Sequence, residues 1–331
     1  MRLAMVGLGR MGANMVRRLL RGGHELVVYD IDPAARERLA GEGAVAVASL
    51  AELREALPAP RTVWVMVPSG QSTEDMLSAL SEELAPGDTI IDGGNSHFKD
   101  SVARAERLAS AGISLLDVGT SGGTHGLERG YCLMIGGPAE VAERHAPIFR
   151  TLAPGASEIA RTPPREARGG AAESCEEGWL HCGPAGAGHY VKMVHNGIEY
   201  GMMQAFAEGF ALFDSAAEER LAANRRYELD KAAIAELWRR GSVVSSWLLD
   251  LIADSLAENP SLDGFSAQVQ DSGEGRWTVE AATEQAVPAY VLTASLFARF
   301  RSRQDDSFAD RLLSAMRFKF GGHVAPPKAG S

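Results

Sequence analysis

The sequence predicts an α/β fold in which an N-terminal, doubly wound parallel β-sheet is followed by an all-α C-terminal domain. Short apolar segments alternate with amphipathic helical windows through the first third of the chain, as in parallel sheets covered by helices on both faces. A glycine-rich turn separates the first of these segments from the first helical window. Strand-like segments disappear after Gly188, and helical windows continue to Phe320.

The predicted elements alternate in a regular order. Runs rich in Leu, Ile and Val predict strands at 3–6, 25–29, 63–67, 89–92 and 113–118, and the helical windows lie at 11–21, 34–40 and 72–84. The segment 153–184 is rich in proline, glycine and small polar residues, which predicts strand remnants and loops that close the first domain. The predicted domains are therefore 1–184 and 185–324, followed by a flexible tail at 325–331.

The composition excludes several classes of protein. Lys and Arg number 33 against 43 Asp and Glu, and the resulting net charge of −10 argues against a nucleic-acid binder. The three cysteines include no C-x-x-C pair, which argues against a disulfide scaffold or structural zinc and favours a reducing cytoplasm. No apolar run approaches ~18 residues, and we find no cleavable leader. We expect a soluble, cytoplasmic protein that binds neither nucleic acid nor membrane.

Gly7, Gly9 and Gly12 form a G-x-G-x-x-G motif directly after the first predicted strand. In a Rossmann-type domain the first glycine permits a tight turn, the second lets the backbone approach a pyrophosphate, and the third lets helix and strand pack closely. The phosphates bind the unpaired N–H groups at the positive end of the helix. The motif is weak alone, but its position in an alternating α/β domain predicts a Rossmann-type dinucleotide site.

Asp30 ends the second predicted strand, close to the distance from the glycine motif that is typical of a ribose-binding carboxylate. Such a carboxylate repels a 2′-phosphate, and the next residue is Ile31 rather than an arginine, so we predict a preference for NAD over NADP. Arg36 and Arg38 lie close enough to allow use of both coenzymes. Alternatively, Asp30 only begins the turn before Pro33, a frequent role of aspartate.

A predicted helix at 188–201 carries the strongest chemical signal. At ~100° per residue, Lys192, His195, Asn196 and Glu199 lie within an arc of roughly 100°. Lys192 and Glu199 are about two turns or ~10 Å apart, beyond a simple i,i+4 ion pair, which suits two groups that address different atoms of one ligand. On this helix alone, a solvated polar face is the simpler interpretation.

Two loops favour a binding site over a solvated face. Asp92-Gly-Gly-Asn-Ser and Thr120-Ser-Gly-Gly both follow predicted strands, at the sheet edge where open α/β folds bind ligands. Gly-Gly pairs expose backbone N–H groups to anions, and Asn95 and Ser121 add directional hydrogen bonds. Either loop alone could be an ordinary turn, but together with the helix they predict a site for an anionic ligand.

Four segments, GLGRMGANM, DGGNS, TSGG and GAGHYVKMVHNGIEYG, resemble those of the 6-phosphogluconate dehydrogenases, the decarboxylating enzymes of the pentose phosphate pathway. The similarity runs from residue 2 to about residue 323. It corresponds to the short form of this family within the β-hydroxyacid dehydrogenase superfamily, without the duplicated helical half of the long form. The resemblance implies an NAD(P)-binding domain, and a helical domain for substrate binding and oligomerisation. It also implies oxidative decarboxylation of 6-phosphogluconate to ribulose 5-phosphate and CO₂ with reduction of NAD.

The resemblance also implies roles for single residues. Lys192 would be the base that takes the C3 hydroxyl proton, and Glu199 the acid that protonates C1 after CO₂ leaves. The predicted cofactor contacts are Gly7, Leu8, Gly9, Arg10, Met11, Gly12, Asp30, Ile31, Val67, Pro68 and Asn95. The predicted substrate contacts are Asn95, Ser121, Gly122, Gly123, His195, Asn196, Tyr200, Arg276, Arg299, Arg317 and His323. No metal is expected.

Four of the predicted substrate contacts are cationic residues near the end of the sequence, and they match the family less uniformly. Arg276 lies in a G-E-G-R-W-T segment that resembles the one in which a family lysine usually binds phosphate, and Arg299 matches another phosphate ligand. Arg317 and His323 match residues that reach into the neighbouring subunit's site, which implies a homodimer or homotetramer. Three of them also have a plain interpretation: Arg299 as part of a solvated helix face, Arg317 as the partner of a helix dipole, and His323 as a structural hydrogen-bonding group.

Two alternative functions stay open at this point. Another β-hydroxyacid dehydrogenase, of the 3-hydroxyisobutyrate type, would use the same lysine base but would need neither Glu199 nor the arginines. A non-catalytic nucleotide-binding protein would keep only the fold. The intact set of Lys192, Glu199 and Asn95 argues against the second alternative.

Overall fold

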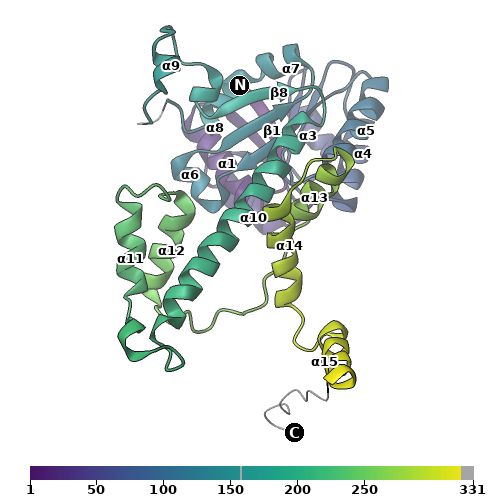
Figure 1. Ribbon diagram of the computed structural model, residues 1–331. Coiled ribbons are helices and arrows are strands. Elements are labelled where there is room, and N and C mark those ends of the chain that lie inside the picture. The colour runs from purple at the N-terminus through teal and green to yellow at the C-terminus, as the bar shows by residue number, and fades with distance from the viewer. Residues whose placement is uncertain (157–158, 322–331) are drawn as a thin grey trace. The chain divides into compact units, whose positions relative to one another are not determined.

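The computed structural model describes residues 1–156 and 159–321 of the chain. Contacts divide the chain into two compact units, Met1–His195 and Asn196–Ser331. One continuous helix, α10 (Ala187–Asp214), contributes residues to both units (Figure 1). The predicted domain boundary at 184–185 falls just before this helix, and the functional division of the chain stays a prediction. His323 and the predicted tail at 325–331 lie outside the described residues.

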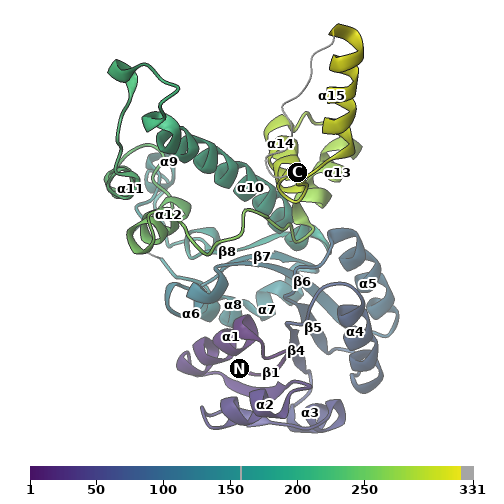
Figure 2. The ribbon, with the colours of Figure 1, turned by 90° about the horizontal axis from the view of Figure 1, so that it is seen from below.

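The first unit contains an eight-stranded sheet with the order β3-β2-β1-β4-β5-β6-β7-β8 (Figure 2). The strands are β1 (Arg2–Val6), β2 (Glu25–Tyr29), β3 (Val45–Ala46), β4 (Thr62–Val65), β5 (Thr89–Asp92), β6 (Ser114–Ser121), β7 (Cys132–Gly136) and β8 (Trp179–Gly183). The first six strands are parallel, and the order reverses between β1 and β4. The predicted doubly wound sheet is therefore confirmed.

The strands β7 and β8 run opposite to the other six. β6 and β7 pair in antiparallel register, and β8 is parallel to β7. The connection from β6 to β7 covers only residues 122–131, whereas a parallel crossover usually needs a dozen or more residues. The connection from β7 to β8 is long enough for a crossover, and its described residues include three α-helices and a short 3-10 helix. The sheet is thus mixed, and the sequence-based prediction of a parallel sheet holds for its first six strands.

The helices of this unit cover both faces of the sheet. They are α1 (Arg10–Arg21), α2 (Pro33–Ala40), α3 (Leu50–Ala56), α4 (Gln71–Glu83), α5 (Phe98–Ser110), α6 (Gly126–Arg129), α7 (Ala139–Arg144), α8 (Ala146–Leu152) and α9 (Pro163–Glu166). Alternate residues of β1 point to opposite faces: Leu3 and Met5 join a core with α1, α7 and α8, while Ala4 and Val6 join a second core with α3, α4 and α5.

The sequence-based prediction located most early elements and missed several later ones. β4 ends at Val65 rather than at residue 67, because the chain turns toward Pro68, which has no N–H to donate to a ladder. The helices α3, α5, α7 and α8 and the strand β7 were not predicted. The segment 153–184 does contain a strand, β8, as well as the short helix α9.

The second unit is helical. After α10 come α11 (Lys231–Arg239), α12 (Trp247–Glu258), α13 (Glu274–Glu284), α14 (Tyr290–Ser302) and α15 (Phe308–Gly321). The hairpin of α11 and α12 packs its own small core against aromatic side chains of α10, among them Phe206 and Phe210. Among the described residues, we find no helix that is both long and apolar enough to cross a bilayer.

Candidate active site

The three glycines of the first loop have different steric roles. Gly7 has a φ of +92°, and a Cβ there would lie 2.4 Å from the carbonyl oxygen of Met66. A Cβ on Gly12 would lie 2.0 Å from the carbonyl oxygen of Gly7, so the first turn of α1 packs directly on the loop. A Cβ on Gly9 would meet nothing within 4 Å. Gly9 therefore leaves open space at the N-terminus of α1, where a dinucleotide's pyrophosphate requires it.

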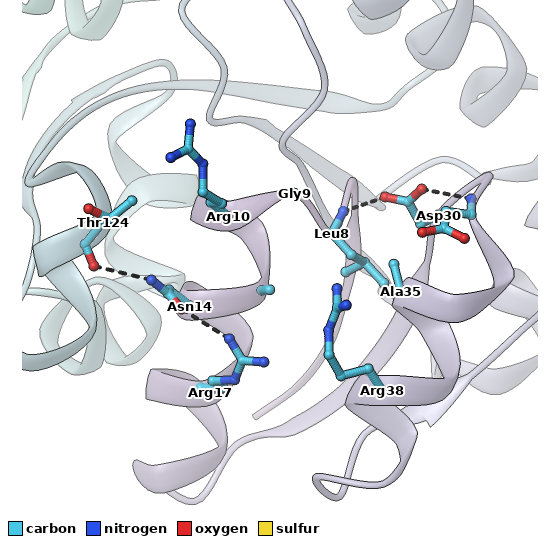
Figure 3. Close-up of a pocket in the computed structure, with 11 residues that line it drawn as sticks. Leu8, Gly9, Arg10, Asn14, Arg17, Asp30, Ala35, Arg38 and Thr124 are labelled. Carbon is cyan, nitrogen blue, oxygen red and sulfur yellow. Dashed lines mark hydrogen bonds between the residues drawn. The ribbon is translucent and has the colours of Figure 1, made fainter. Parts of the chain in front are cut away.

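A cavity of about 520 Å³ opens beside this loop (Figure 3). Its lining includes four of the predicted cofactor contacts, namely Leu8, Gly9, Arg10 and Asp30. The other lining residues are Ala13, Asn14, Arg17, Asp32, Ala35, Arg38 and Thr124. The cavity thus lies at the carboxyl end of β1, between the glycine loop and the end of β2, as expected for the adenosine half of a dinucleotide.

Asp30 organises one wall of this cavity. Its Oδ2 accepts a hydrogen bond of 2.6 Å from the Leu8 N–H, and its Oδ1 accepts one of 2.9 Å from the Asp32 N–H. The second bond is the turn-forming contact considered from the sequence, and the first connects the carboxylate to the glycine loop. Arg36 donates to the Asp30 carbonyl oxygen at 3.2 Å, while Arg38 reaches from α2 toward Leu8 (Figure 3). One side of the cavity therefore combines two carboxylates with a guanidinium.

The remaining predicted cofactor residues do not line this cavity: Gly7, Met11, Gly12, Ile31, Val67, Pro68 and Asn95. Ile31 is 85% exposed, and Gly7 and Gly12 shape the loop instead. The lining residues Asn14 and Arg17 follow Arg10 at helical spacing on α1, a signal that the sequence offered. Thr124 carried no such signal, because it comes from the distant connection between β6 and β7.

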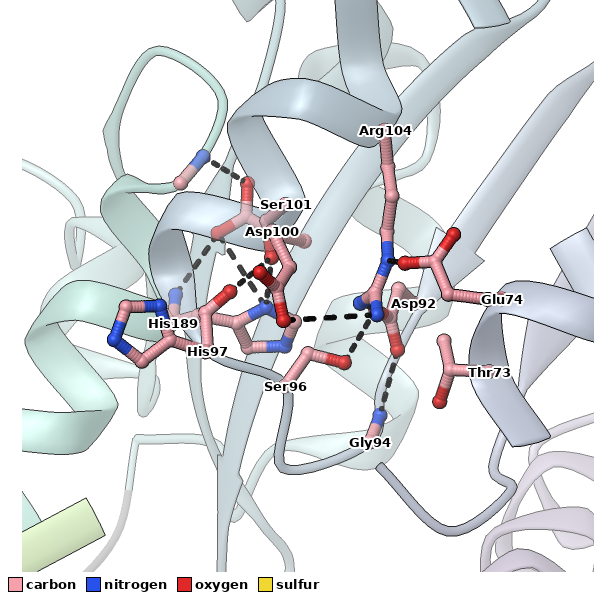
Figure 4. A network of polar contacts seen from close by, with 12 residues as sticks. Thr73, Glu74, Asp92, Gly94, Ser96, His97, Asp100, Ser101, Arg104 and His189 are labelled. Atoms are coloured by element: carbon pink, nitrogen blue, oxygen red, sulfur yellow. Dashed lines mark hydrogen bonds and ion pairs between the residues drawn. The ribbon is translucent and has the colours of Figure 1, made fainter. Parts of the chain in front are cut away.

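The loop after β5 is fixed by a buried carboxylate. Asp92 accepts hydrogen bonds from the Gly94 N–H at 3.1 Å, the Ser96 hydroxyl at 2.7 Å and Arg104 Nη1 at 3.1 Å (Figure 4). Arg104 is only 1% exposed and also donates to Glu74 at 2.6 Å. This network holds the D-G-G-N-S turn in one conformation, with Asn95 exposed at the carboxyl edge of the sheet.

A second buried carboxylate anchors the start of α10. Asp117 of β6 accepts hydrogen bonds from the backbone N–H groups of Gly186 at 2.7 Å and His189 at 2.8 Å. A negative charge at a helix N-terminus is stabilising, because the first N–H groups have no partner within the helix. The His189 ring also contacts the Ser101 hydroxyl at 2.7 Å. α10 is therefore held firmly against β6 one turn before Lys192.

Lys192 lies directly against β6. A Cβ on Gly119 would be 2.3 Å from the Cβ of Lys192, so only glycine fits at that point of the strand. His195 Nε2 lies 3.3 Å from the Ser121 hydroxyl, two residues further along β6. Burial raises the pKa of the neighbouring Cys132 thiol, and the positive charge of Lys192 partly offsets this by lowering the same pKa. The first unit thus brings Lys192, His195 and Ser121 together, as the sequence predicted.

The next turns of α10 belong to the second unit. Asn196 and Tyr200 are buried and Glu199 is half-buried. The Tyr200 hydroxyl accepts a hydrogen bond of 3.2 Å from the Ser272 N–H, and the Arg299 guanidinium carbon lies 3.6 Å from the centroid of the Tyr200 ring. A Cβ on Gly275 would be 2.6 Å from the Tyr200 ring, so the G-E-G-R-W-T segment packs closely on this face of α10.

The arginines predicted to bind phosphate occupy defined positions. Arg276 donates to both oxygens of Asp271, at 2.6 and 3.1 Å, and Arg299 donates to the Gln270 carbonyl oxygen at 2.8 Å. Arg317 is exposed on α15, and His323 is outside the described residues.

Across residues 1–156 and 159–321, no cluster of three or more His, Cys, Asp or Glu could hold a metal ion.

Comparison with known proteins decides the family. Residues 2–160 match a family model of the NAD binding domain of 6-phosphogluconate dehydrogenase, and residues 188–223 and 216–323 match its C-terminal domain. An NAD(+)-dependent, decarboxylating 6-phosphogluconate dehydrogenase of Haloferax volcanii is 40% identical over 329 residues, which cover 99% of each chain. The chain belongs to the 6-phosphogluconate dehydrogenase family.

Further family members differ in length and coenzyme. An NADP(+)-dependent, decarboxylating 6-phosphogluconate dehydrogenase of Bacillus subtilis is 31% identical, and the match covers 96% of this chain but 65% of that protein. The solved structure of Plasmodium falciparum 6-phosphogluconate dehydrogenase superposes with a TM-score of 0.76 at 24% identity. That match covers 99% of this chain and 67% of the other, and it shows the shared fold.

Sequence reasoning missed the residues that hold the site in place. Asp117 had a signal, because it is a lone acid inside an apolar predicted strand, and such a residue needs a buried partner. For Gly119, the only available signal in the sequence was its position two residues before Ser121. Asp271 and Arg303 had no signal, because the five-residue separation of Asp271 from Arg276 is not a helical pair spacing and Arg303 reaches Asp271 from a later segment. Whether the predicted residues bind cofactor and substrate stays a prediction.

Proposed function

We propose that the chain is a decarboxylating 6-phosphogluconate dehydrogenase that converts 6-phosphogluconate to ribulose 5-phosphate and CO₂ with NAD as hydride acceptor. One observation carries this proposal. A single helix, α10, bears Lys192 and Glu199 two turns apart, and the Lys192 end is fixed at Gly119 and Ser121 of the sheet edge. A simple oxidation of a hydroxy acid needs the lysine but not the second acid.

The cofactor fits the glycine loop. Gly9 leaves open space at the start of α1, where unpaired N–H groups favour a pyrophosphate, and Asp30 lies where a ribose would bind. When bound, NAD accepts the hydride that leaves C3 of the substrate. Arg38 lines the same cavity on the side of Asp30, where it could pair with a 2′-phosphate, so NAD is the proposed preferred coenzyme and NADP a second one.

The lysine moves the first proton. In its neutral form, Lys192 Nζ takes the proton of the C3 hydroxyl as the C3–H bond breaks. The product of this step is a ketone β to the carboxylate, which accepts the electron pair of the breaking C1–C2 bond as CO₂ leaves. The protonated Lys192 then donates a hydrogen bond to the C3 oxygen and stabilises the charge that develops there.

The glutamate moves the second proton. Loss of CO₂ leaves an enediol, and Glu199 protonates the carbon that becomes C1 of ribulose 5-phosphate. Because Glu199 follows Lys192 by about two turns of one helix, the two groups reach different atoms of the same substrate. We propose that Asn95, Ser121, Gly122, Gly123, His195, Asn196, Tyr200, Arg276 and Arg299 hold the sugar acid, and that Arg317 and His323 reach the substrate of the neighbouring subunit.

Self-association is part of the proposal. Residues 308–320 of α15 are exposed throughout, including large apolar side chains such as Leu313, Met316 and Phe320. An apolar helix of this size is typical of an interface with another chain, and a second copy is the occupant expected for a homodimer or homotetramer. Arg317 lies on this helix, so the same contact would bring its side chain to the partner subunit's substrate.

The three free cysteines fit the expected cytoplasmic location.

The proposal is tested by assaying wild type and Lys192→Ala with 6-phosphogluconate and NAD. Wild type should form NADH, and Lys192→Ala should lose turnover while its affinity for NAD stays within about twofold. Lys231→Ala is the matched control, because Lys231 pairs with Asp214 and has no role in the proposed site. The proposal fails if wild type does not oxidise 6-phosphogluconate, or if Lys192→Ala keeps full activity.

A further inference from the structure

The segment Gln270–Ser272, which precedes α13, contacts three of the predicted substrate residues of the second unit. The Gln270 carbonyl accepts from Arg299, the Asp271 carboxylate accepts from Arg276, and the Ser272 N–H donates to Tyr200. Three residues that come from α10, α13 and α14 are thus held by three consecutive positions of one loop. A fourth side chain, Arg303, contacts the same loop and has been given no role so far.

Asp271 joins two guanidinium groups. Its side chain is only 4% exposed and pairs with Arg276 through both oxygens and with Arg303 Nη1 at 3.0 Å. Hydrogen bonds from Arg276, together with those from Arg303, hold the pKa of this carboxyl below its usual range despite burial. The Phe300 ring lies beside both cations, 4.5 Å from the guanidinium carbon of Arg276 and 5.3 Å from that of Arg303. The two guanidinium groups are therefore held as a pair.

Both arginines keep donors for a ligand. Arg276 uses Nε and Nη2 for Asp271, and its Nη1 has no hydrogen bond to the described residues. Arg303 uses Nη1 for Asp271, the Val269 carbonyl and the Gln270 side chain, which leaves its Nε and Nη2 without a described partner. Their side chains are 50% and 22% exposed. A guanidinium group has five N–H donors, so binding to Asp271 does not exhaust either one.

The local charge suits a phosphate monoester. Arg276, Arg299 and Arg303 place three guanidinium groups around this loop, and the nearby carboxylates are Asp271, Glu274, which accepts from the Ser272 hydroxyl, and Glu280. Guanidinium groups also match phosphate oxygens in geometry, and a pair of them offers several parallel N–H donors. Without Asp271, the two guanidinium groups would repel each other and separate.

We propose that Arg303 is a further ligand of the substrate's phosphate and that Asp271 is the positioning residue that holds Arg276 and Arg303 together. This inference rests on the proposed function, because it assigns the phosphate of 6-phosphogluconate to this pair. A purely structural role for Arg303 would be to close the loop over the end of α14. The two roles differ in their effect on a ligand without phosphate: loss of a phosphate ligand leaves the affinity for it unchanged, whereas loss of a structural contact weakens its binding as well.

The test is calorimetric binding of 6-phosphogluconate and of gluconate, the same sugar acid without phosphate, to the full chain. Arg303→Gln should raise the Kd for 6-phosphogluconate by about 10-fold or more, the effect of losing a charge-assisted hydrogen bond, and leave the Kd for gluconate unchanged. Arg303→Lys should restore part of the loss. Arg240→Gln is the matched control, because Arg240 follows α11 and its one ion pair among the described residues is with Glu236.

Asp271→Asn separates positioning from charge. The substitution makes the site more positive, so a simple electrostatic effect would tighten 6-phosphogluconate binding, whereas loss of positioning weakens it by about 10-fold. Tighter binding would overturn the role of Asp271. Equal losses for both ligands in Arg303→Gln, or no loss, would overturn the role of Arg303. Turnover is measured separately: a wild type that prefers 6-phosphogluconate to gluconate in binding but does not oxidise it contradicts the proposed function and not this inference.

Discussion

Replacing Gly119 with alanine perturbs the contact that places Lys192. The Cβ of an alanine there would lie 2.3 Å from the Cβ of Lys192 and 2.9 Å from the carbonyl oxygen of Gly188. Carbon atoms pack at about 3.5–4.0 Å, so helix and strand would have to separate by more than about 1 Å at this point. Because Asp117 ties the start of α10 to the same strand, the helix has little freedom to move away without breaking those bonds.

The expected loss is mainly in turnover. A misplacement of about 1 Å at a reacting group costs on the order of 100-fold in rate, so kcat should fall about 100-fold in Gly119→Ala. Inserting one carbon into a packed contact costs about 1–3 kcal/mol of unfolding free energy. The coenzyme cavity is lined mainly by residues that follow β1 and β2, and Thr124 is its one lining residue from the connection after β6, so the Kd for NAD should change much less than kcat.

The assay measures initial rates of NADH formation at saturating NAD, together with thermal melting. Gly209→Ala is the matched control, because Gly209 lies on the same helix and a Cβ there meets nothing within 4 Å. That control should keep wild-type activity and gain up to about 1 kcal/mol from the better helix propensity of alanine. A Gly119→Ala protein with wild-type kcat would refute the inferred placement of Lys192.

Three further outcomes follow from the described contacts. Arg38→Gln should lower kcat/KM for NADP more than for NAD, and Asp30→Asn should raise the NADP-to-NAD ratio; unchanged ratios would contradict the assigned cavity. Burial lowers the pKa of His145 below 6.5 in the folded protein. As the pH falls from 7 to 5, this histidine is therefore protonated more readily in the unfolded chain, and the free energy of unfolding should decrease. His145→Gln should flatten that slope in thermal melts, and an unaltered slope would exclude His145 as its cause. The double variant Leu313→Asp/Met316→Asp should sediment as a monomer and should form no NADH from 6-phosphogluconate. A monomer that keeps this activity would rule out the proposed role of α15.

The early part of the fold was predictable because its signals are local. The strand 25–29 and the glycine loop with Gly7 and Gly12 depend on neighbouring residues, and the structure places them where the pattern indicated. The reversal at β7 was not predicted, because it depends on the length of the β6–β7 connection and not on the pattern of either strand. Small helices such as α7 lack a long periodic signal and are fixed by packing on the sheet.

The site was predictable to the extent that one helix carries it. Lys192, His195 and Glu199 share a face of α10 by periodicity alone, and the contact of His195 with Ser121 confirms one pairing of helix and loop. Their anchors were not predictable in the same way. Asp117 acts on the start of α10, and Asp271 joins Arg276 to Arg303 of a later segment. No spacing rule connects Asp117 with His189 or Asp271 with Arg303 before the chain is folded.

One measurement tests the proposed reaction most directly. Purified protein is supplied with NAD and 6-phosphogluconate carrying ¹³C at C1, and NADH and ¹³CO₂ are quantified in the same sample. The proposed mechanism predicts one ¹³CO₂ for each NADH, with both lost together in Lys192→Ala. NADH formation without ¹³CO₂ would instead show a simple hydroxyacid dehydrogenase, and it would contradict the decarboxylation and the role given to Glu199.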